Sequence, residues 1–163
     1  MINPESFHRD VRKTLKPFLK KYFDGGNHTF GAKSIVFPEV DIHFRRPQLG
    51  AALTKPLIAI DEYDILKQTR KATKTGMISY EDHPMRFLIF TASTNLNWAD
   101  HDNVANLLHM LFFSAASELG AAGMRVVRVG NTLPIPLDAS QEYHVSQRIV
   151  TFRITQNFAH PVA

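Results

Sequence analysis

Apolar residues recur at helical spacing in two segments of the chain, and the first of these lies at the N-terminus. Asn3-Pro4-Glu5 is a typical helix start, because Asn caps free N–H groups, Pro fits the first turn and an acid favours the positive end. Pro17 lies inside the pattern and lacks a backbone N–H, so it predicts a kink or a split near Lys13. The apolar face consists of Phe7, Val11, Leu15, Phe18, Leu19 and Tyr22, and the other face carries Arg9, Arg12, Lys13, Lys16 and Lys20.

The second helical pattern covers residues 97–123 and is the strongest in the chain. Its apolar face consists of Val104, Leu107, Leu108, Leu111, Ala115 and Leu119. Met110, Phe112 and Phe113 widen this stripe beyond what one face of a sheet requires. Two interpretations follow. The helix packs between layers of its own domain, or it packs one face on the sheet and the other on a neighbouring subunit.

Between and after these helices, alternating and continuous apolar runs predict strands at 40–45, 57–60, 86–91, 124–129 and 150–158. The second of these runs leaves open a continuation to residue 66. Phe87-Leu88-Ile89-Phe90 is apolar throughout, which predicts a strand buried on both faces. The last strand has the clearest alternation, with Val150, Phe152, Ile154 and Phe158 on one face and Thr151, Arg153, Thr155 and Asn157 on the other.

The order helix, strands, long helix, strands predicts an α+β fold. We expect a mostly antiparallel sheet packed by one long helix and an N-terminal amphipathic helix. The length of 163 residues fits a single domain over residues 1–163. The basic and polar stretch at 67–76 is either a hairpin arm or a mobile loop, and residues 159–163 are expected to form a loose tail.

Composition narrows the possible chemistry. The absence of Cys excludes disulfides, thiolate zinc sites and Cys nucleophiles. A net charge of +4 suits either an anionic partner such as nucleic acid or plain solubility. We find no apolar run long enough for a bilayer and no secretion signal, so the sequence predicts no membrane partner and synthesis in the cytoplasm.

Motifs for catalysis and cofactor binding are missing from the sequence. There is no P-loop, no dinucleotide fingerprint and no H-E-x-x-H. Asp100-His101-Asp102 is the densest polar cluster, but neighbours on a helix point about 100° apart and do not converge on one ion. We therefore expect no enzyme, no cofactor and no catalytic or metal residues. A small metal-dependent hydrolase using strand-end acids such as Asp61 is the weakest alternative.

Basic residues form two clusters that suit contact with phosphates. One is the polar face of the N-terminal helix, and the other consists of Lys67, Arg70, Lys71 and Lys74. No aromatic residue is interleaved with the second cluster, and no helix-turn-helix is evident, which argues against sequence-specific binding. Non-specific contact with DNA or with an acidic protein surface stays open.

The order of the elements, and the pattern of apolar and polar residues in each, resemble those of a known family. A basic amphipathic helix is followed by PLIAIDEYD, a polar stretch, RFLIFTAST, the helix NVANLLHMLFFSAASEL and the strand RIVTFRITQNF. This arrangement resembles the tail-terminator proteins of long-tailed bacteriophages and, more loosely, other small head-to-tail connector proteins. The resemblance covers roughly residues 56–158, whereas 25–53 and 130–140 have no counterpart.

The resemblance implies a structural virion protein without catalytic residues. Such proteins form a homo-oligomer, typically a hexameric ring, which caps the tail tube, contacts the tail tube protein and meets the head connector or stopper protein. The location implied is the tail or neck of the virion, with host cytoplasm during assembly. Lys67, Arg70, Lys71 and Lys74 would then be a mobile contact element near DNA in the channel. Met110, Phe112 and Phe113 would face a neighbouring subunit. The alternatives are a non-specific DNA-binding protein and another neck protein.

Overall fold

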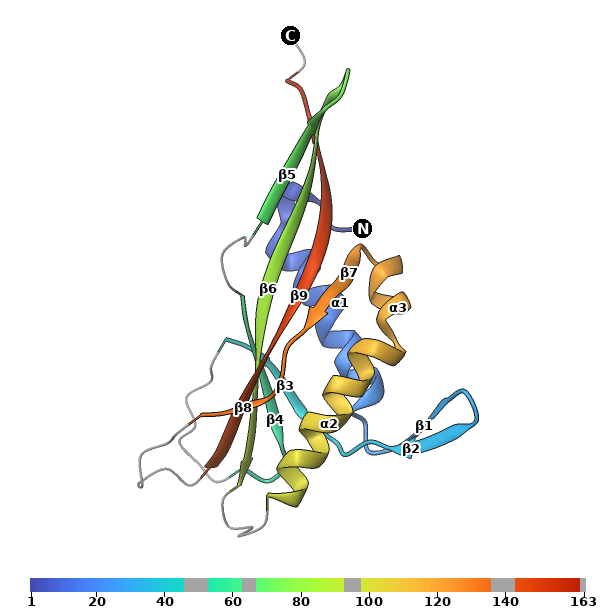
Figure 1. The fold of residues 1–163 in the computed structure, drawn as a ribbon, viewed down its shortest axis with the longest axis vertical. Helices are drawn as coiled ribbons and strands as arrows, with labels where there is room; N and C mark the ends of the chain where they lie inside the picture. The colour runs from blue at the N-terminus through green and yellow to red at the C-terminus, as the bar shows by residue number, and fades with distance from the viewer. Residues whose placement is uncertain (46–52, 63–66, 93–97, 136–142, 162–163) are drawn as a thin grey trace.

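The computed structural model describes residues 1–45, 53–62, 67–92, 98–135 and 143–161. It has the expected α+β fold (Figure 1). The helical elements are η1 (Pro4–Ser6), α1 (Phe7–Tyr22), α2 (Ala99–Ser114) and α3 (Ala116–Ala121). The strands are β1 (Asn27–Phe30), β2 (Lys33–Val36), β3 (Asp41–Phe44), β4 (Leu57–Glu62), β5 (Lys67–Ala72), β6 (Gly76–Ala92), β7 (Met124–Val129), β8 (Leu133–Pro134) and β9 (Tyr143–Ala159).

Two very long strands form the centre of a seven-stranded sheet. β6 and β9 have 17 residues each and pair antiparallel from end to end, from Gly76 opposite Ala159 to Ala92 opposite Tyr143. The outer edge of β6 carries β4 and then β5, and the outer edge of β9 carries β7 and β8. Only β3 and β4 are parallel within this sheet as described, so the sheet is mostly antiparallel, as predicted.

The first helix is continuous where a break was expected, and the second is broken where one continuous helix was expected. Pro17 does not split α1, which runs without interruption through Lys13. Pro17 is exposed, so its missing donor lies on the side of the helix away from the core. The single helix expected over 97–123 is two helices, because Ala115 leaves helical geometry (φ −115°, ψ 19°). No helix in the described part of the chain is both long enough and apolar enough to cross a membrane.

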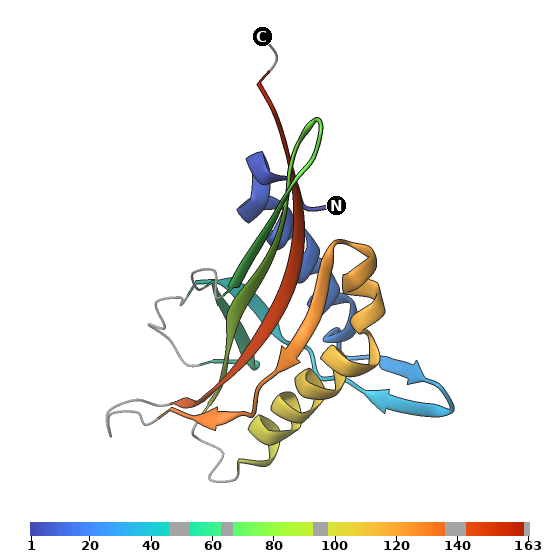
Figure 2. The ribbon, with the colours of Figure 1, turned by 45° about the horizontal axis from the view of Figure 1, so that its top comes forward.

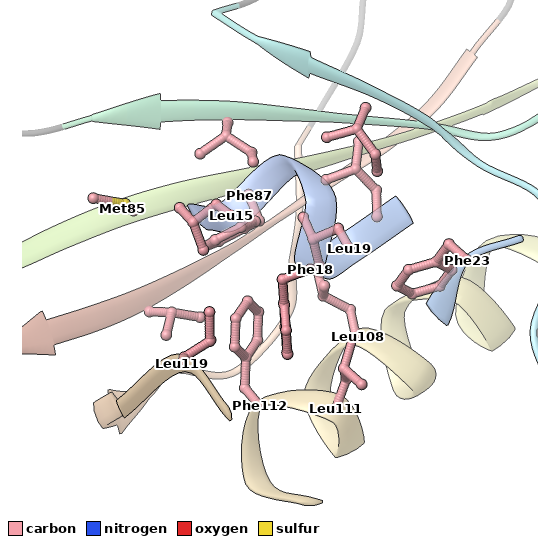
Figure 3. Close-up of a cluster of buried hydrophobic side chains, with 14 of the residues drawn as sticks. Leu15, Phe18, Leu19, Phe23, Met85, Phe87, Leu108, Leu111, Phe112 and Leu119 are labelled. Carbon is pink, nitrogen blue, oxygen red and sulfur yellow. The ribbon is translucent and has the colours of Figure 1, made fainter. Parts of the chain in front are cut away.

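One face of the sheet is covered by the three α-helices, and the main core lies between them (Figure 3). Leu15 and Phe18 of α1, together with Phe112 of α2, meet Phe87 and Phe152 of the central strands. The Phe112 ring lies 5.0 Å from that of Phe87 and 5.8 Å from that of Phe152. Aromatic rings at these separations add to the free energy of burial.

A smaller apolar cluster lies on the other face of the sheet. It contains Leu57, Ala59, Leu88, Phe90 and Val145. Phe87-Leu88-Ile89-Phe90 is therefore buried on both faces, and each of its side chains is at most 2% exposed, which confirms the prediction from its continuous apolar run.

β5, β6 and β9 extend beyond the helices as an arm (Figures 1 and 2). We use "the arm" for β5, residues 73–75, the first part of β6 and the last part of β9. The stretch 67–76, for which the sequence left two alternatives, is thus a hairpin arm rather than a loop. Gly76 is required in this arm, because a Cβ atom there would lie 1.8 Å from the carbonyl oxygen of Phe158. The tail after β9 begins with an anchored residue, since the His160 N–H donates to the Thr75 carbonyl at 2.9 Å.

Candidate interaction surfaces

The basic residues predicted as a contact element lie along the free edge of the arm. Arg70 and Lys71 are exposed on β5, and Lys74 is exposed in the turn that follows. Their register places them on different faces, because Arg70 pairs with Ser79 and Lys71 with Ile78, and successive strand residues alternate. Lys67 lies on β5 opposite Asp82, and its side chain is outside the described part of the structure. Basic side chains on an edge strand also prevent edge-to-edge aggregation.

The tip of the arm carries exposed apolar side chains. Met77 and Phe158 are directly opposite each other and share the face on which the helices pack further down. The helices do not reach this far, so Met77 is 36% exposed and Phe158 is 43% exposed. Two adjacent apolar side chains on a projecting arm are a feature that a partner surface would bury.

The three apolar residues predicted to widen the α2 interface have different environments. Phe113 is 62% exposed and lies beside the His109 ring, at 4.9 Å between centroids. Met110 is half-buried against the main core. Phe112 is fully buried and packs on Phe18, Phe87 and Phe152, so its assignment as an interaction residue was wrong. Of the three side chains, only Phe113 is freely available to another subunit.

The helix-free face of the sheet carries two ion pairs. Arg153 on β9 donates two hydrogen bonds to Asp82 on β6, at 2.8 and 3.1 Å. Arg86 on β6 donates to Asp61 on β4 at 2.7 Å. Asp61 and Asp82 are therefore held by arginines, which accounts for acids at these strand positions without a catalytic role.

His101 joins the start of α2 to the two central strands. Its Nδ1 atom lies 2.8 Å from the Thr91 hydroxyl, and its Nε2 atom lies 2.6 Å from the Ser146 hydroxyl. All three residues are buried, and His101 is only 1% exposed. Burial, aided by the nearby His144, lowers the pKa of His101 to about 4, whereas Asp102 acts weakly in the opposite direction. A neutral imidazole donates from one nitrogen and accepts at the other, so it bonds both hydroxyls.

A Ser–His pair at this distance has the geometry of an activated nucleophile, but its surroundings do not suit catalysis. Ser146 is only 2% exposed, and the small pocket that reaches Thr91 and His101 is not lined by Ser146. The third partner is a hydroxyl rather than a carboxylate, so no hydrogen-bonded carboxylate orients this imidazole or stabilises its charged form. Within the described ranges, no three His, Asp or Glu side chains are placed to hold a metal ion.

Arg148 is a second buried polar group between α2 and the sheet. It is 5% exposed, and its guanidinium contacts His109 Nδ1, the Gly130 carbonyl and the Thr132 hydroxyl. Burial lowers the pKa of Arg148, and burial followed by the charge of Arg148 lowers the pKa of His109. These contacts fix the chain after β7 against α2, directly beside the exposed Phe113.

A polar network inside the arm was not foreseen from the sequence. Glu81 accepts hydrogen bonds from Gln68 at 2.6 Å and Ser79 at 3.1 Å, and its other oxygen lies 2.8 Å from His83 Nε2. The Phe7 ring of α1 lies 4.8 Å from the His83 ring. In the sequence these residues are scattered polar positions, and only the pairing of β5 with β6 brings them together.

Comparison with models of protein families finds no match to this chain, and comparison with curated proteins finds none either.

Proposed function

We propose that this chain is a structural subunit of the neck of a long-tailed bacteriophage. In this proposal it forms a ring that caps the tail tube and contacts the head connector. The observation that carries the proposal is the exposed apolar pair Met77 and Phe158 at the tip of a projecting arm. Strands of 17 residues, about 55 Å long, exceed what a core of this size requires. An arm of this kind suits contact between subunits.

A closed ring requires two different contact patches on each subunit. The arm tip supplies one of them. Phe113 on α2 supplies the other, and Figure 1 places α2 well away from the tip. We propose that the arm tip of one copy packs against Phe113 of the next. The basic residues Arg70, Lys71 and Lys74 then lie near the contact, where they are available to the tail tube or to DNA in the channel.

A structural role also agrees with the chemistry of the polar groups. The acids Asp61 and Asp82 are paired with arginines, and the Ser146–His101 pair faces the core. The described polar clusters therefore bind elements of this chain to one another.

The ring contact is tested by mixing two complementary variants. Negative-stain electron microscopy of the wild-type protein is expected to show rings with a central opening. Phe158→Asp removes the arm patch and Phe113→Asp removes the α2 patch, so each variant alone is expected to form no rings. An equimolar mixture retains one intact contact between unlike chains and is expected to form heterodimers only.

Val36→Asp is the matched control, because Val36 is 64% exposed on the β1–β2 hairpin and belongs to neither patch. This variant is expected to form rings as the wild type does. Rings that persist in both patch variants would contradict the proposed contact.

A further inference from the structure

The outer face of α1 carries a continuous row of cations. Arg9, Lys13, Lys16 and Lys20 follow one another at intervals of three or four residues, and Arg12 lies three or four residues from Arg9 and Lys16. Side chains at this spacing are neighbours on a helix, and like charges there destabilise it by a few tenths of a kcal/mol a pair. An anion bound along the row would remove this repulsion.

Carboxylates within the described residues do not neutralise this row. Lys13, Lys16 and Lys20 form no ion pair there, and Arg9 only approaches Asp10 at 3.7 Å. Asp10 itself accepts hydrogen bonds from the Ser6 hydroxyl at 2.7 Å and the Asn3 N–H at 3.0 Å. Most other described acids are paired with basic residues of this chain. A second copy therefore offers few free carboxylates to match the row.

A pocket of about 550 Å³ lies beside the row, between α1 and the ends of β3 and β4. Arg12 and Arg45 line it together with Asp61, whose carboxylate is already paired with Arg86. The Arg12 guanidinium lies 5.6 Å from the Phe44 ring centroid, and its buried Nε atom has no hydrogen-bond partner among the described residues. Arg45 is exposed, with a backbone φ of 67° that non-glycine residues seldom adopt. The Arg45 N–H donates to the Ile60 carbonyl at 2.8 Å, which holds the backbone in that conformation.

We infer that this surface, formed by Arg9, Arg12, Lys13, Lys16, Lys20 and Arg45, binds the phosphate backbone of double-stranded DNA. From Arg9 to Lys20 the helix rises about 16 Å. Measured along the duplex axis, where each strand carries one phosphate per about 3.4 Å, that distance corresponds to about five phosphates of a strand. We expect these cations to contact phosphates, which carry no sequence information, so binding is non-specific and depends on release of counterions.

This inference does not depend on the ring, because α1 contains neither the arm tip nor Phe113. The test is the fluorescence anisotropy of a short labelled DNA duplex, titrated with the full chain from about 50 to about 200 mM salt. Six phosphate contacts would give a slope of log K against log salt of about −5.4, at about −0.9 per contact. The ring is scored on the same samples by light scattering, so loss of the ring and loss of DNA binding are separate readouts.

The test variant is Lys13→Gln, Lys16→Gln and Lys20→Gln together, since Gln has a helix propensity close to that of Lys. Its salt slope is expected to fall to about −2.7, because three contacts are removed. The matched control, Lys33→Gln, Arg125→Gln and Arg128→Gln together, removes the same charge from exposed positions on β2 and β7. It is expected to keep the wild-type slope. Circular dichroism and melting temperature verify that both variants fold.

Any one of five outcomes would overturn the inference. The first four are no binding of the duplex by the wild type at low salt, an unchanged slope in the α1 variant, an equal loss of slope in the matched control, and equally tight binding of polyglutamate. The last of these four would indicate an acidic protein as the partner. Displacement of the duplex by inorganic phosphate at constant ionic strength would indicate a small-anion pocket instead, and would also overturn it.

Discussion

Phe112 and Phe113 are adjacent in the chain but have opposite environments. Phe112 is fully buried among aromatic rings of α1 and the central strands, whereas Phe113 is 62% exposed. The sequence could not separate them, because α2 is apolar around much of its circumference and both residues extend its stripe. Only the packed position of the helix distinguishes a core residue from a surface one.

Alanine substitutions at these two positions measure the difference. Phe112→Ala is expected to lower the free energy of unfolding by about 3–5 kcal/mol, because a large buried ring is replaced by a cavity. Phe113→Ala is expected to change it by less than about 0.5 kcal/mol, since that ring is mostly in water. Urea unfolding of both variants gives the comparison, and equal losses would contradict the assignment.

The low pKa of the buried His101 predicts that stability depends on pH. Its pKa is about 4 in the folded state and about 6.5 when it is exposed, so the unfolded chain binds a proton that the folded chain does not. Stability is therefore expected to fall as the pH drops from about 6.5 toward 4, by up to about 3 kcal/mol from this residue, and to change no further below pH 4.

The measurement is urea unfolding at several pH values for the wild type and for His101→Gln. The variant is expected to lose this part of the pH dependence, because Gln has no proton to gain in that range. His160→Gln is the control, since His160 is exposed at the end of β9. If His101→Gln shows the same dependence of unfolding free energy on pH as the wild type, the buried imidazole is not its cause.

The elements that the sequence predicted correctly are those in which apolar residues recur with an unbroken helical or strand period. β9 alternates as expected, and Phe152 and Ile154 face the core while Thr155 faces away. β6 was predicted at 86–91 but begins at Gly76. The missed part contains Glu81-Asp82-His83-Pro84, which has the composition of a turn. A hydrogen-bond network and an arginine pair satisfy these polar groups in the folded chain, and neither is visible from local sequence.

The candidate sites depended on tertiary structure in the same way. The contact of His101 with Thr91 and Ser146 joins residues 10 and 45 positions apart, and no spacing rule identifies it. The hairpin arm at 67–76 was one of two alternatives, because basic polar residues suit an edge strand and a loop equally. Pro17 was weighted too heavily as a helix breaker, since its cost is small where the carbonyl that it leaves free is on the solvent side.

Gly76 holds the arm together, and its substitution is a test at the level of the element. Gly76→Ala brings a Cβ atom against the Phe158 carbonyl, so β6 and β9 have to separate at the tip. Amide hydrogen exchange is expected to accelerate in β5 and in residues 154–159, while α2 and the centre of β6 stay protected. Uniform acceleration across the chain would contradict an arm that opens separately from the core.

At the scale of the whole molecule, the proposed assembly role rests on the shape. Helices and sheet form a core at one end, and the arm extends beyond it (Figures 1 and 2). The exposed Phe113 lies on a different part of this shape from the exposed pair Met77 and Phe158 at the arm tip. Two edge strands of the sheet carry exposed basic side chains, Lys71 on β5 and Arg128 on β7. Charged side chains on edge strands disfavour strand pairing between copies. We therefore propose that a ring forms through side-chain patches rather than through strand pairing.

The closed ring that we propose is tested most directly by the mass of the protein in solution. Light scattering after size exclusion, over a range of protein concentrations, is expected to give one species near six times the 18.5 kDa of a single chain. That mass is expected to stay constant on dilution, because a closed ring satisfies both patches of every subunit. A mass of 18.5 kDa at every concentration, or one that grows without limit as in an open filament, would contradict the claim.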